Sequence, residues 1–186
     1  MIVRNLAFLF LASLLVLIVS GTVSAQHRDY FTDNEIDIVR DAQQLDNRVN
    51  ILVKIIDRRF TALGIDPNAA AAAKKDKTDW GPEPTGTRTE LLGDIKAILQ
   101  KAIEDIDNVA ERPDLMVTDV TERKPKTFKE VFPIAVKSLA AAAGRYKPIL
   151  QGEGAKTTDR VETGIISNII DLCDEITASV AKLPSK

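Results

Sequence analysis

The chain has 186 residues, of which 45% are hydrophobic and 28% charged, and its formal net charge is −2. Nucleic-acid-binding proteins normally carry a clear basic excess, so this near balance argues against that class. Aromatic residues make up only 5%, and no run alternates apolar and polar residues, which favours an all-helical protein.

Residues 1–25 have the composition of a secretory signal peptide. The basic residue Arg4 precedes the apolar run LAFLFLASLLVLIV, and small residues follow up to Ala25. This apolar run is shorter than the roughly 20 residues that span a bilayer, which favours cleavage after Ala25 over a retained N-terminal anchor. We therefore expect an exported protein, periplasmic or secreted, with one domain at residues 26–186 and no stable membrane insertion after cleavage.

The first predicted helix, 32–63, begins at a capping box and ends at a glycine. Thr32 and Glu35 have the spacing in which a hydroxyl and a carboxylate satisfy backbone amides reciprocally, and Gly64 is a natural stop. The apolar residues follow a heptad-like spacing, which predicts one continuous bundle helix. They are Ile38, Ala42, Leu45, Val49, Leu52, Ile56 and Leu63. Arg59 interrupts this seam.

The same helix has a second, smaller apolar strip. Ile51 and Ile55 lie four residues apart and away from the seam, so their side chains meet on one side of the helix. Lys54 and Arg58 stand beside them. We expect the connection that follows the helix to cover this strip, through Trp80 or its alanines. A dimer interface, or a surface for a protein partner or a membrane, is the alternative.

Three further helices are predicted, at 88–112, 128–151 and 158–182. Pro133 and Pro148 lie within the third range, which predicts a curved rather than a broken helix. Val161 is assigned to the inner face of the fourth helix and Asp94 to the polar face of the second. Four amphipathic helices bury their apolar faces most simply as a four-helix antiparallel bundle. Residues 65–86 form its long connection, which is either flexible or covers the first helix.

Cys173 is the one cysteine of the chain, so it has no partner for an internal disulfide. It lies between Ile169 and Ile176 on the apolar side of the fourth predicted helix, where a cysteine behaves as a small hydrophobe. We expect a buried structural thiol, with a reactive or intermolecular thiol as the alternative.

Residue patterns for a cofactor, a metal or catalysis are missing from the sequence. Haem would need axial ligands, and after the predicted cleavage site the chain offers only His27 and Met116. Di-iron bundles use Glu-x-x-His pairs, which do not occur here. The chain also has no G-x-S-x-G, no P-loop and no dinucleotide-binding motif. We expect no cofactor, no metal and no enzymatic activity.

A few polar residues lie within or beside the apolar stripes. Asp46 and Asp57 flank the stripe of the first helix, Arg59 occupies its seam, and Glu162 lies in the apolar arc of the fourth. A polar residue inside a bundle costs stability unless it is paired. These four residues therefore either lie at bundle edges and pair with each other to fix the register, or they form a small polar pocket for an anion or an organic solute.

The segment YFTDNEIDIVRDAQQLDNRVNILVKIIDRRF, Tyr30–Phe60, contains a T-D-x-E-I cap and an R-D-A-Q motif. In both motifs it resembles the first helix of uncharacterised exported bacterial proteins. The resemblance implies export and helicity, and it carries no activity with it.

Two functions of different classes follow from these patterns. The first is an exported, non-catalytic helical bundle that acts as an envelope structural, adaptor or binding component, with a protein partner or a second copy of itself. The second is a sensor-like helical module that binds a small solute between its helices.

Overall fold

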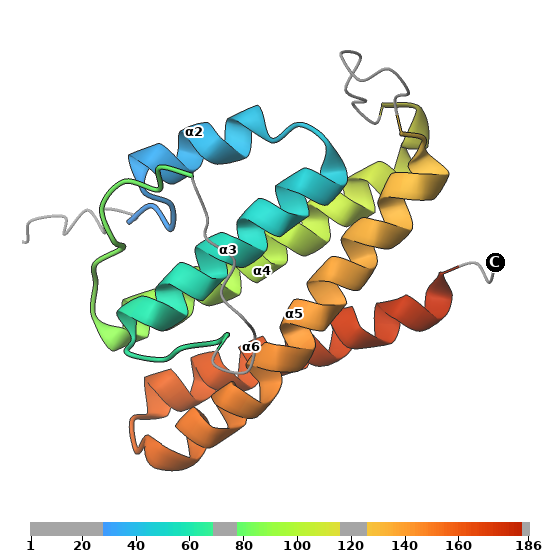
Figure 1. Ribbon diagram of the computed structural model, residues 1–186. Helices are drawn as coiled ribbons and strands as arrows, with labels where there is room; N and C mark the ends of the chain where they lie inside the picture. The colour runs from blue at the N-terminus through green and yellow to red at the C-terminus, as the bar shows by residue number, and fades with distance from the viewer. Residues whose placement is uncertain (1–27, 69–77, 116–125, 184–186) are drawn as a thin grey trace, which may run out of the picture.

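The computed structural model describes residues 28–68, 78–115 and 126–183 (Figure 1). The predicted signal peptide, His27, Met116 and the alanines of the long connection lie outside these ranges. Over the described residues the protein is all-helical, as predicted. Its α-helices are α2 (Asp33–Asp41), α3 (Leu45–Ala62), α4 (Arg88–Glu111), α5 (Phe128–Lys156) and α6 (Arg160–Ser179). Two 3-10 helices follow α4 and α6, namely η1 (Pro113–Leu115) and η2 (Val180–Lys182).

The described residues thus form five α-helices rather than four, because the predicted helix 32–63 is wrong in its middle. The chain leaves helical geometry at Ala42, whose ψ is 75°, and at Gln44, whose ψ is 132°. The side chain of Arg48 donates to the carbonyl oxygen of Ala42 over 2.8 Å, which satisfies a group that the break leaves outside the helix. After the break the chain turns back, and α2 packs against α3 (Figure 1).

The starts of α2, α4, α5 and α6 agree closely with the sequence, whereas the start of α3 at Leu45 was not predicted. Thr32, Thr87 and Thr127 each form a capping box with a glutamate three residues on. Helix α5 continues through both of its internal prolines, as predicted, and ends at Lys156, beyond the expected end at residue 151.

The four long helices α3 to α6 enclose one core. Helix α3 packs on α4 and α5, and α6 packs on α4 and α5. Consecutive helices run in opposite directions, so α3 and α5 share one direction and α4 and α6 the other (Figure 1). Leu52 of α3 and Ile169 of α6 are fully buried, as the stripes predict. None of the helices in the described ranges is long and apolar enough to cross a membrane.

Helix α6 presents a slightly different face from the predicted one. Val161 is 61% exposed, whereas Ile166, Ile169, Cys173 and Ile176 are buried. The inner face therefore begins one turn later than expected. The buried thiol of Cys173 is confirmed, and burial raises its pKa to about 11, so it remains an unreactive neutral group.

Candidate functional site

The apolar strip of α3 belongs largely to the folded body. Ile55 is fully buried, and Ile51 is half-buried against the core. Trp80 also packs partly buried against the core. Its ring centroid lies 5.9 Å from the Lys54 ammonium and 5.6 Å from the Arg58 guanidinium, within cation–π range. The described fold therefore leaves Ile55 inaccessible to a partner.

Three of the four polar residues considered for a pocket have partners in separate places. Asp46 pairs with Lys126 at 3.1 Å. Glu162 accepts from the guanidinium of Arg88 over 3.2 Å and from the hydroxyl of Thr157 over 2.8 Å. These contacts lie near the start of α3 and at the start of α6 respectively, so they belong to different parts of the bundle.

Asp57 lies in a third place, on the α5 side of α3. The buried hydroxyl of Tyr146 donates to its carboxylate over 2.6 Å, and Asn68 donates to the other oxygen over 2.9 Å. Burial, reinforced by the Asp57 charge, holds the pKa of Tyr146 well above its usual value. The tyrosine therefore stays a hydrogen-bond donor and ties α5 to α3.

Arg59, the fourth residue, is the centre of a buried charge network. Its guanidinium binds the carboxylate of Glu35 through two nitrogens, one of them at 2.6 Å, and also donates to the carbonyl oxygen of Tyr30 over 2.6 Å. Glu35 is fully buried and Arg59 is 1% exposed. Arg58 adds a second contact to Glu35 at 3.1 Å. The bidentate pair fixes α2 on α3, since each buried charge neutralises the other.

Asp94 of α4 extends this network. Arg28 donates to its carboxylate over 3.0 Å, and the Nε atom of Arg59 lies 3.8 Å away. Although both neighbours are cationic, burial dominates and raises the pKa of Asp94 to about 6. The network joins the N-terminal segment, α2, α3 and α4.

Sequence reasoning identified only part of this network. It placed Arg59 in the seam and assigned Glu35 to a cap, but it assigned Asp94 to a solvated face, which is wrong. Asp94 is 6% exposed because the N-terminal segment folds back over the start of α4. The available signal was the seam arginine, which requires a buried acidic partner. Apart from Arg28 Nη1 and Arg59 Nε, which have no hydrogen-bond partner, the buried donors and acceptors here are occupied by one another, so we assign the network to stability rather than to ligand binding.

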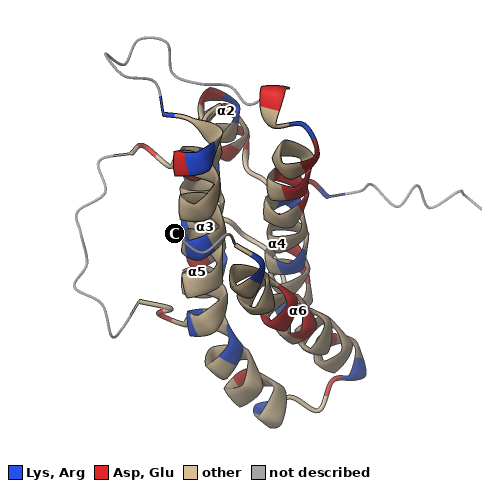
Figure 2. Ribbon diagram, turned by 90° about the vertical axis from the view of Figure 1, so that its right-hand side faces the viewer, with Lys and Arg blue, Asp and Glu red and all other residues tan. Residues whose placement is uncertain are grey.

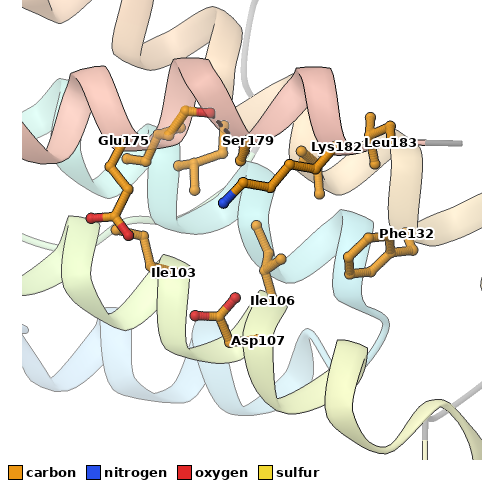
Figure 3. Close-up of a pocket in the computed structure, with 11 residues that line it drawn as sticks. Ile103, Ile106, Asp107, Phe132, Glu175, Ser179, Lys182 and Leu183 are labelled. Carbon is orange, nitrogen blue, oxygen red and sulfur yellow. Dashed lines mark hydrogen bonds between the residues drawn. The ribbon is translucent and has the colours of Figure 1, made fainter.

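A cavity of about 270 Å³ lies at the other end of the helices, between the last turns of α4, the first turns of α5 and the end of α6 (Figure 3). Its lining is mostly apolar and includes Ile103, Ile106, Phe132, Val136, Leu139, Ile176 and Leu183. The polar residues of the lining are Asp107, Glu175, Ser179 and Lys182.

The charged groups of the cavity rim converge. Figure 3 shows the Lys182 ammonium extending between the carboxylates of Glu175 and Asp107. Neighbouring acidic residues of the same helices are paired, Asp105 with Lys101 and Asp174 with Lys147. Within the described ranges no ion pair holds the three rim groups. As far as the described residues go, these groups are available to a charged ligand.

A second, more open hollow of about 280 Å³ lies beside the first, between α4 and α6. It is lined by polar groups that include Lys96, Gln100, Asn168 and Asp171, and it shares Glu175 with the apolar cavity. Glu175 therefore stands at the boundary between an apolar and a polar compartment.

Comparison of the chain with protein-family models, with curated proteins and with solved structures found no match. Function is therefore inferred from the geometry of this cavity.

Proposed function

We propose that the protein is an exported, non-catalytic helical protein that binds a small organic molecule in the cavity between α4, α5 and α6. Helices α3 to α6 serve as an antiparallel four-helix scaffold, and α2 is an addition docked on α3. Export is supported by the composition of residues 1–25.

The observation that carries the proposal is the cavity itself. Ligand sites are typically concave and mostly apolar, with a few polar groups that orient the ligand, and they often lie between the helices of bundles. The volume of about 270 Å³ is close to the lower end of the usual range, roughly 300 Å³. A ligand of modest size fits it.

A ligand-binding function is favoured over that of an adaptor that docks through α3. The strip considered for docking includes Ile55, which is fully buried in the single chain. The cavity, in contrast, offers apolar surface from three helices that the described residues leave open.

The proposal is tested by ligand binding to the protein recovered outside the cytoplasm. Isothermal titration calorimetry with a panel of small amphiphilic compounds should find binders, and Ile103→Trp should weaken their binding at least tenfold, because the indole occupies the cavity. Ile134→Trp is the matched control, since Ile134 is 47% exposed on α5 and does not line the cavity. Equal binding by the two variants, or a panel without binders, contradicts the proposal.

A further inference from the structure

We propose that the ligand is a small organic cation, an amine with a compact apolar body, whose ammonium group pairs with the rim carboxylate, Asp107 or Glu175, that the Lys182 ammonium leaves unneutralised. This inference rests on the proposed function and specifies the chemical class of the ligand.

The charges at the rim indicate that the ligand is a cation. Two carboxylates and one ammonium line the cavity. Lys182 can neutralise only one carboxylate charge, so one negative charge is left for the ligand. An anionic ligand would have to reach Lys182 while lying beside both carboxylates, and like charges at close range oppose such binding.

The ends of the surrounding helices add to the negative potential at the cavity. Neither α4 nor α6 has a basic residue in its last turn, although Arg112 follows α4 as its C-cap and Lys182 follows α6 in η2; both helices end beside the cavity. The C-terminal end of a helix carries a partial negative charge, which a cation stabilises. Acidic residues are numerous along α4 and α6 (Figure 2). The positive end of α5 is offset by Glu130 in its capping box.

The shape and lining of the cavity determine what the part of the ligand beyond its ammonium group should be. Branched aliphatic side chains and Phe132 form the floor, and the charged groups are confined to the rim. A compact ring or a short branched chain would fill the floor and release water from its apolar surface. The ligand should therefore have one apolar end and one charged end, rather than several polar groups.

Three probes of matched shape test the head group: cyclohexylmethylamine, cyclohexylmethanol and cyclohexanecarboxylate. At low salt we expect the amine to bind about three- to tenfold more tightly than the alcohol, and the carboxylate to bind most weakly. The rim is exposed, so the preference for the amine should shrink in high salt.

Variants of the rim separate charge from fit. Asp107→Asn and Glu175→Gln should bring the affinity of the amine towards that of the alcohol, without changing the alcohol. Lys182→Gln should tighten the amine. Glu83→Gln is the matched control, because it changes net charge equally and lies outside the cavity.

The outcomes distinguish the two proposals. Equal affinities for the three probes, or a preference for the carboxylate, overturn the proposal of a cationic ligand. The proposal that the cavity is a binding site then still stands. If none of the three probes binds, while other compounds of the panel bind and Ile103→Trp weakens their binding, only the proposal of a cationic ligand is overturned. Failure of every compound overturns the proposed function as well.

Discussion

At Asp94 the loss of water outweighs the attraction of two arginines. Its side chain is 8% exposed, yet it receives one hydrogen bond from Arg28, and the nearest nitrogen of Arg59 is 3.8 Å away. Arg59 is committed to Glu35, so it gives Asp94 only partial compensation. A carboxylate in this position is more costly in the folded protein than in the unfolded chain.

This cost predicts a pH dependence. The pKa of Asp94 is about 6 in the folded protein, and an aspartate in an unfolded chain titrates near 3.9. Between these values the folded state binds more protons, so the contribution of Asp94 to stability falls as pH rises. The free energy of unfolding of the wild type, relative to Asp94→Asn, should fall by about 1–3 kcal/mol from pH 4 to pH 7.

Urea unfolding at several pH values measures this difference. Asp37→Asn is the control, because Asp37 is 67% exposed and should give a nearly flat difference. A difference for Asp94→Asn that stays constant or rises with pH would show that the carboxyl is not destabilised by burial.

At the scale of the element, α2 depends on its docking. It has nine residues, fewer than an isolated helix needs for stability in water. Its capping box and the buried ion pair between Glu35 and Arg59 provide the stability that so short a helix lacks by itself.

Arg59→Met should therefore release α2. The substitution leaves the Glu35 carboxylate without its main partner, and loss of one member of a buried pair costs about 3–5 kcal/mol. Hydrogen exchange should show α2 amides losing protection before those of α3 to α6. Adding Glu35→Gln should restore part of the lost stability, since it removes the unpaired charge. Arg40→Met, which breaks an exposed pair, should cost under about 1 kcal/mol.

Local signals were enough to predict where α2, α4, α5 and α6 begin, but not where α3 begins. A capping box such as that of Thr32 and Glu35 depends on residues three apart, so a short-range pattern identifies it. The break after Asp41 was missed because the apolar spacing continues through it, and residues 42–44 include neither glycine nor proline. Its cause is tertiary. In one continuous helix Glu35 and Arg59 would lie about 36 Å apart, and only the reversal brings them together.

The cavity was not predictable for a related reason. Its floor is made of residues such as Ile106 and Ile176, which follow the ordinary pattern of a core. Whether such residues close on each other or leave a space depends on how three helix ends meet. The position of Glu175 beside an apolar cavity became visible only in the fold.

For the whole molecule, the charge network and the cavity lie at opposite ends. Asp94 and Asp107 are both on α4, about 20 Å apart along its axis. Substitutions at such separations usually act additively on stability. Ligand binding and the docking of α2 can therefore be studied separately.

The proposed export is tested on the whole chain. Mass spectrometry of the protein recovered outside the cytoplasm should find a chain that begins at Gln26, because cleavage is expected after the small residue Ala25. That chain keeps Arg28 and its contact with Asp94. Recovery of an intact chain from Met1, held in the inner membrane, would replace export with anchoring.

The reversal after α2 also sets an order of assembly. Arg28 and Asp94 are separated by 66 positions in the chain, and Glu35 and Arg59 by 24. During synthesis, which begins at the N-terminus, Arg28 and Glu35 appear first and must wait for their partners. Closing such long loops costs chain entropy, so the contacts form late unless other packing has already brought the ends together. Arg28 and Glu35 are thus synthesised early, but their charged groups should be among the last to be desolvated as the domain folds.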